Sequence, residues 1–176
     1  MRKLKKFLYT ALPLVILAVI LSFFSELKLV MVCLFSLLLL ISYLIYKEKI
    51  GQELVVAFLI AIAWTSYYLY EYTHSNLMLG KINLFPLVAW TFGLVFLREI
   101  YERLKGRHRL AKATIIYLLG LFVVEYIGYY LLNIRLDSSF PSLLGLGIIH
   151  ATLLLKVFYL TAGPIYLLIT DYLKVK

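Results

Sequence analysis

Long apolar runs are the feature that most constrains how this chain can fold. They cover residues 7–24, 29–46, 53–72, 84–104, 110–132 and 141–172. A helix needs roughly 20 apolar residues to cross the hydrocarbon core of a bilayer, and these runs are mostly near that length. Their apolar residues are continuous and do not alternate with polar ones, which excludes a transmembrane β-barrel. The pattern predicts an all-α, polytopic integral membrane protein, a helical bundle of six transmembrane helices.

The composition leaves no room for a second, soluble domain. Of the 176 residues, 64% are hydrophobic and 15% charged, with a mean hydropathy of +0.95. A soluble domain of this size cannot bury so much apolar surface. No linker or low-complexity tract interrupts the runs, so we expect one transmembrane domain over residues 1–176. The first run follows a basic N-terminus without a small-residue cleavage site, which is typical of a retained signal anchor.

Basic residues indicate how the helices are oriented. With a cytoplasmic N-terminus, only Lys28, Lys81 and Arg135 fall in external loops, and Lys156 falls within the membrane. The other fourteen of the 18 Lys and Arg residues are then cytoplasmic. Such a bias follows the positive-inside rule and predicts a protein of the cell membrane with both termini in the cytoplasm.

The fourth helix is expected to start near Pro86, which suits a first helical turn, and to extend into the cytoplasm. Two i,i+4 pairs of opposite charge, Arg98 with Glu102 and Glu99 with Arg103, would support this extension.

Two external segments resemble each other. Each begins Glu-Tyr, at Glu71 and at Glu125, and has a basic residue ten positions later, Lys81 or Arg135. Each also ends in Phe-Pro. Helices three-four and five-six could therefore form a parallel repeat of helical hairpins. Similar interface chemistry in two unrelated hairpins explains the same pattern.

Glu125 and His150 are the candidate catalytic residues. Glu125 precedes Asn133, the first residue after its run, by eight residues, about 12 Å along a helix. His150 lies nine residues after Pro141, about 13 Å along the next. Ionisable groups in a membrane are costly and normally face the protein interior with a partner. We therefore expect the two side chains to meet. Alternatively, the Glu ties helices together and the His donates to a carbonyl group.

Other polar side chains near this pair are candidate substrate-binding residues: Tyr68, Glu71, Tyr129, Arg135 and Lys156. Their alternative interpretations are structural. Tyr side chains commonly anchor helices at the membrane interface, Glu71 can be solvated there, and Lys156 can extend its ammonium group towards water.

One arrangement of side chains could hold a metal ion. Glu71, His74, Glu125 and His150 supply the carboxylate and imidazole ligands that suit Zn²⁺, two from each hairpin. No nucleotide-binding, HExxH, GxSxG or CxxC motif is present, and we expect no cofactor. The basic stretch at residues 105–109 carries no nucleic-acid-binding motif and is interpreted as a solvated, lipid-facing loop.

Three classes of function remain open. In the first, the chain is a small membrane enzyme that acts on a lipid or isoprenoid-like substrate, with Glu125 and His150 as an acid–base pair. In the second, these groups relay protons in a transporter of a small solute. In the third, they join helices in a structural or assembly protein. The expected partners are membrane lipids, an apolar small-molecule substrate and, as a further option, a second copy of the chain, but no nucleic acid.

Overall fold

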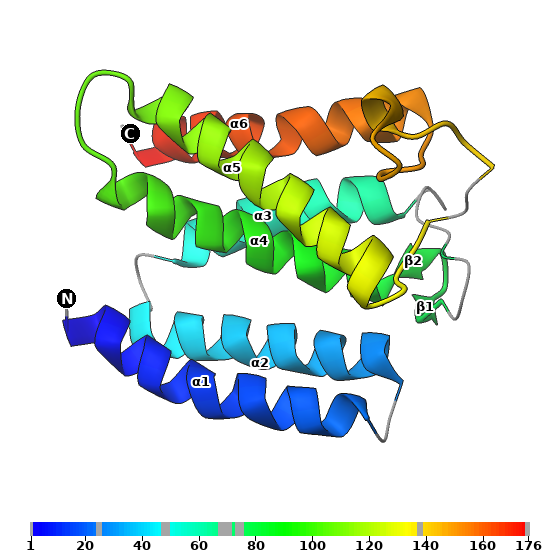
Figure 1. Ribbon diagram of the computed structural model, residues 1–176. Helices are drawn as coiled ribbons and strands as arrows, with labels where there is room; N and C mark the ends of the chain where they lie inside the picture. The colour runs from blue at the N-terminus through cyan, green and yellow to red at the C-terminus, as the bar shows by residue number, and fades with distance from the viewer. Residues whose placement is uncertain are drawn as a thin grey trace.

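The computed structural model describes residues 2–23, 26–46, 50–66, 72, 76–136 and 139–174. Within these residues six α-helices lie side by side (Figure 1). They are α1 (Arg2–Ser22), α2 (Leu27–Tyr46), α3 (Gly51–Thr65), α4 (Leu84–Arg103), α5 (Arg109–Tyr126) and α6 (Leu153–Lys174). The predicted all-α class is confirmed.

The loops that connect consecutive helices lie at two opposite ends of the bundle. The loop end carries the α3–α4 and α5–α6 connections, and the basic end carries the α4–α5 connection, the start of α1 and the end of α6 (Figure 1). α4 packs against α2, α3, α5 and α6, while α1 packs mainly on α2. The core therefore lies among α3, α4, α5 and α6, with the α1–α2 hairpin at its side.

A short β-hairpin precedes α4 at the loop end. Its strands, β1 (Met78–Leu79) and β2 (Ile82–Asn83), pair antiparallel around Gly80, whose φ of +61° favours glycine. The buried Asn83 then caps α4, because its side-chain oxygen accepts a hydrogen bond of 3.3 Å from the Phe85 backbone N–H. Pro86 follows in the first turn, where its missing N–H costs nothing, as the sequence predicts.

Among the described residues, four helices are long and apolar enough to cross a membrane: α2, α4, α6 and α5 together with the turn that follows it. With 15 residues, α3 spans about 22 Å, which is shorter than the hydrocarbon core of about 30 Å. The described apolar part of α1, Phe7–Ser22, is also short. Six spans are therefore not confirmed.

The expected start of the sixth helix at residue 141 is wrong. α6 begins at Leu153, and only a 3₁₀ turn, η3 (Leu143–Gly145), forms in the segment before it. Gly145 and Gly147 adopt positive φ there, and glycine lowers helix propensity. In a repeat, the segment before α6 would match the segment before α4, but the first contains a 3₁₀ turn and the second a β-hairpin. The repeat is not confirmed, and Glu71, on which its comparison depends, lies outside the described residues.

Other predicted boundaries also changed. α3 ends at Thr65, before the predicted residue 72, and α5 passes at Ile127 into a π-helical turn, η2 (Ile127–Leu131). At the end of α4 both predicted i,i+4 pairs are present. Arg98 lies 3.6 Å from Glu102, and Arg103 lies 3.2 Å from Glu99.

Candidate functional site

Glu125 lies in the last turn of α5, at the loop end, where its side chain is partly buried. The Tyr159 hydroxyl of α6 donates a hydrogen bond to its carboxylate. In the part of the chain that the structure describes, no cationic side chain forms an ion pair with it. Among the described residues, therefore, no paired cation holds Glu125 in its ionised form, which suits a group that transfers protons.

A close approach of α5 and α6 positions this hydrogen bond. The Tyr117 hydroxyl, two turns before Glu125 on α5, donates to the backbone carbonyl of Tyr159. Its ring lies against Gly163, where a Cβ atom would come within 2.7 Å of ring carbon atoms. Because glycine leaves this space open, the two helices approach closely enough to place Tyr159 beside Glu125.

Tyr72 connects this site to the rest of the loop end. Its backbone forms an isolated antiparallel bridge with Leu136, so the α3–α4 and α5–α6 connections meet at this point. Burial, followed by the charges of Glu125 and Tyr129, raises the pKa of Tyr72 well above its ordinary value. The Tyr72 hydroxyl therefore stays protonated at neutral pH. The Lys28 ammonium of α2 lies 4.4 Å from the centre of its ring, a cation–π contact.

Tyr129 and His150 form the second part of the site. Tyr129 is buried in the π-helical turn η2, and its ring stacks on the His150 imidazole with centroids 5.8 Å apart. The backbone N–H of His150 donates to the Tyr129 hydroxyl oxygen at 3.1 Å. His150 Nδ1 lies 2.9 Å from the carbonyl oxygen of Phe140, which can only accept, so Nδ1 carries the proton. In the neutral ring, Nε2 is then the basic nitrogen.

The expected direct contact between Glu125 and His150 is not formed. No hydrogen bond or ion pair joins them in the described residues, and each contacts a different tyrosine, Tyr159 or Tyr129. The reason is the late start of α6. His150 lies in the irregular segment before the helix, so the argument from equal helical depth does not hold.

Arg135 and Lys156 border the same region but bind backbone atoms. Arg135 Nε donates to the Tyr129 carbonyl at 3.0 Å, and Lys156 Nζ donates to the Ser142 carbonyl at 3.4 Å. The Lys156 ammonium therefore extends from α6 towards the loop end and not towards the basic end. Tyr68, Glu71 and His74 lie outside the described residues, so their predicted places in the site stay predictions.

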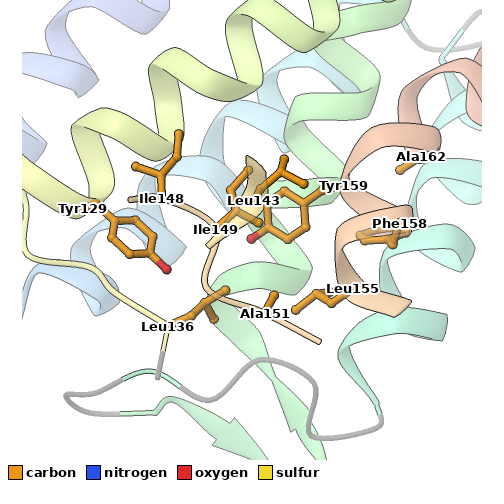
Figure 2. Packing of buried hydrophobic residues seen from close by; sticks show 10 residues of the cluster. All are labelled: Tyr129, Leu136, Leu143, Ile148, Ile149, Ala151, Leu155, Phe158, Tyr159 and Ala162. Atoms are coloured by element: carbon orange, nitrogen blue, oxygen red, sulfur yellow. The ribbon is translucent and has the colours of Figure 1, made fainter. Parts of the chain in front are cut away.

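An aromatic cluster surrounds Tyr159. The rings of Trp64 and Phe158 lie 4.5 Å apart, those of Trp90 and Phe158 lie 4.7 Å apart, and Trp90 meets Tyr159 edge-on at 5.1 Å. These side chains come from α3, α4 and α6. Figure 2 shows Phe158 and Tyr159 with the buried residues around the segment that precedes α6. The surroundings of Tyr159 are therefore largely apolar.

Three of the described non-glycine residues in the segments between η2 and α6 adopt positive φ. Asn133, Leu144 and Ile149 all have φ between 51° and 54°. This region is costly for residues other than glycine, most of all for the β-branched Ile149. Strained residues and π-helical turns often occur at functional sites, and both lie here within the same loop-end region.

Sequence reasoning missed a second polar cluster at the basic end. Arg98 of α4 is only 3% exposed. Its Nε donates to Glu53 of α3 at 3.2 Å, and one terminal nitrogen donates to Asp171 of α6 at 2.6 Å and to Thr170 at 3.2 Å. Tyr101 also donates to Asp171, and Arg109 of α5 reaches the same carboxylate at 3.4 Å.

This cluster is a complete ion-pair network that joins four helices. Its acidic residues, Glu53, Glu102 and Asp171, all lie within 4 Å of an arginine side chain. The sequence placed Arg98 in a solvated extension of α4. The available signal was that α3, α4 and α6 each have an ionisable residue near the same end, although the sequence does not show which faces meet.

In the described residues, no group of three or more His, Cys, Asp or Glu side chains could hold a metal ion. The set considered from the sequence includes Glu71 and His74, which lie outside the described residues. The fold and site thus define a helical bundle with membrane-length helices. It has an ion-pair network at one end and, at the other, an acid that forms no ion pair with the described residues.

Comparisons of the chain with protein-family models, curated proteins and solved structures find no match.

Proposed function

We propose that this chain is a small membrane enzyme that performs acid–base chemistry on a lipid or isoprenoid-like substrate. The observation that supports this proposal is the state of Glu125, whose carboxylate is hydrogen-bonded by Tyr159 and has no cationic partner among the described residues. The acids of the basic-end network, in contrast, are all beside arginines. Ionisable groups inside a membrane protein that are not paired for structure are candidates for function.

In this proposal Glu125 is the general acid–base and Tyr159 orients its carboxylate. His150 is the second proton-transfer group, because its Nδ1 donates to the Phe140 carbonyl and its Nε2 forms no hydrogen bond with the described residues. Tyr129 positions His150 through its ring and its hydroxyl. The aromatic cluster around Tyr159 suits an apolar substrate and can stabilise positive charge developing on it.

We further propose that the loop end faces outward and that both termini are in the cytoplasm of the cell. The excess of basic residues on the other side of the helices supports this orientation. Substrate would then reach Glu125 from the outer half of the bilayer. Tyr68, Glu71, Tyr129, Arg135 and Lys156 remain the proposed substrate-binding residues.

The test compares Glu125→Gln with wild type in cells that lack a similar protein. The amide keeps the shape of the side chain and removes the titratable group. We expect wild type to change the abundance of one or more lipid or isoprenoid species, measured by mass spectrometry of membrane extracts. Cells that express Glu125→Gln should have the same lipid profile as cells that carry an empty vector. Glu99→Gln is the matched control, since Glu99 pairs with Arg103 and lies away from the site.

Both proteins must be equally abundant and monodisperse in detergent for this comparison. The proposal is wrong if Glu125→Gln gives the wild-type profile, or if wild type itself leaves the lipids of the cells unchanged. Unchanged lipids with a loss of thermal stability in Glu125→Gln would instead indicate a structural protein.

A proton-coupled transporter is the second candidate. The basic-end network favours transport, because it adds Asp171 near one end of α6 to Tyr159 near the other. α6 therefore has polar groups near both of its ends. Proteoliposomes that take up a solute in response to a pH gradient, and lose this uptake with Glu125→Gln, would favour transport over catalysis.

A further inference from the structure

The connection between α4 and α5 is an exposed basic segment that projects from the basic end (Figure 1). Five basic residues lie in or beside it: Arg103, Lys105, Arg107, Arg109 and Lys112. They divide into two groups. Arg103 and Arg109 bind acidic residues of the protein, Glu99 at 3.2 Å and Asp171 at 3.4 Å.

Lys105, Arg107 and Lys112 form the second group, which we call the cationic patch. All three side chains are exposed, and none has an acidic partner in the described part of the chain. Lys112 extends back from the first turn of α5, and its ammonium donates to the Lys105 carbonyl at 3.4 Å. Three positive charges are thus held within a short segment, and no acidic side chain among the described residues forms an ion pair with any of them.

The position of the patch indicates what pairs with these charges. It lies directly between α4 and α5, two of the helices that are long and apolar enough to cross a membrane. A short connection between such helices lies at the level of the lipid headgroups. Basic clusters at this level attract anionic lipids, and phosphate oxygens accept hydrogen bonds from Lys and Arg side chains.

We propose that the cationic patch binds the phosphate-bearing headgroup of an anionic lipid. This binding joins α4 and α5 at the membrane surface and does not depend on the reaction proposed at Glu125. Each cation contributes about fivefold to the affinity at low ionic strength, so the three together contribute on the order of a hundredfold.

The experiment uses the full chain purified in a neutral detergent. Phosphatidylglycerol or phosphatidylcholine is titrated into the micelles, and the unfolding temperature is recorded for each lipid fraction. We expect phosphatidylglycerol to raise the unfolding temperature of wild type and phosphatidylcholine to have a much smaller effect. The triple variant Lys105→Gln/Arg107→Gln/Lys112→Gln should need far more phosphatidylglycerol for the same rise, and 0.5 M salt should abolish the wild-type effect, since salt screens exposed charges.

Two controls make the result specific. Lys81→Gln removes an exposed cation from the turn of the β-hairpin, at the opposite end of the bundle, and should respond as wild type does. Inorganic phosphate alone should leave the unfolding temperature unchanged. The proposal is overturned if the triple variant responds like wild type, if Lys81→Gln loses as much of the response, or if free phosphate reproduces the effect. If the triple variant does not fold, the salt dependence of wild type is the deciding test. The proposal is then overturned if phosphatidylglycerol still raises the unfolding temperature of wild type in 0.5 M salt.

Discussion

At Arg98 a single guanidinium group is bound by residues of two other helices. It donates to Glu53 of α3 and to Thr170 and Asp171 of α6 while it lies within α4. Arg98 and Glu53 are both almost fully buried, at 3% and 2% exposed. Buried ion pairs add little net stability when complete, but the loss of one partner leaves a charge with no compensation.

Arg98→Met tests this reasoning at the residue scale. The change leaves the buried Glu53 without its cation, so we expect a loss of about 3–5 kcal/mol in the free energy of unfolding. Arg103→Gln is the control, because the Arg103 side chain is exposed and its pair with Glu99 is worth only about 0.5 kcal/mol. Unfolding in mixed micelles with increasing sodium dodecyl sulfate measures both. Equal losses in the two variants would show that the network does not stabilise the bundle.

Among the helices, the contact of α5 with α6 decides where the candidate site forms. α5 is buried over only 6% of its apolar span, so few contacts fix its position. Tyr117 lies against Gly163 and donates to the Tyr159 carbonyl, one turn before Gly163 in α6. The depth to which the Tyr117 ring fits against α6 therefore sets the distance between Glu125 and Tyr159.

Gly163→Ala should separate these two helices. The added Cβ would lie 2.7 Å from the Tyr117 ring, and insertion of a methyl group into such a contact costs about 1–3 kcal/mol. We also expect the activity that depends on Glu125 to decrease, because Tyr159 moves with α6.

Gly120→Ala on α5 is the matched control. Nothing lies within 4 Å of a Cβ atom at Gly120, so there the better helix propensity of alanine should raise stability by about 0.5–1 kcal/mol. Thermal unfolding in detergent compares the two variants. A stabilising Gly163→Ala would contradict the close packing of α5 on α6.

Over the whole molecule, apolar surface covers the outside of the bundle. Leu119 and Leu131 of the α5 span are 61% and 72% exposed, and Leu153 of α6 is 78% exposed. In a membrane these surfaces contact lipid, and they can also contact a second copy of the chain. The two polar clusters lie at opposite ends of the bundle. The orientation of the chain in a membrane would therefore determine which cluster faces which side.

Cysteine labelling tests that orientation. In a Cys33→Ser background, we expect Lys81→Cys and Arg135→Cys to react with an impermeant maleimide in intact cells, because they lie at the loop end. Lys105→Cys, in the α4–α5 connection, should react only after the membrane is opened. Labelling of Lys105→Cys in intact cells, with protection of the other two positions, would reverse the proposed topology.

The sequence by itself determined the class of protein and the approximate position of most helices. Apolar runs near the length of a bilayer leave a chain few alternatives to helices, because every backbone polar group must be satisfied internally in lipid. Local signals were also reliable: Pro86 lies in the first turn of α4, and both i,i+4 pairs at its other end formed. Hydropathy could not show that α3 stops at Thr65 or that α6 starts at Leu153, since both excluded segments are apolar.

Tertiary structure alone decided which side chains meet. Glu125 and His150 are both near the loop end, as expected, but they do not contact each other. Glu125 contacts Tyr159, and His150 contacts Tyr129. Each residue added to a helix turns the side-chain direction by about 100°. In an irregular segment such as the one before α6 this regular rotation is lost, so the direction of the His150 side chain cannot be predicted from its position in the sequence. Arg98 is the clearest case: its sequence neighbours suggest a solvated helix end, and only the packing of α3, α4 and α6 around it makes it a buried centre of charge.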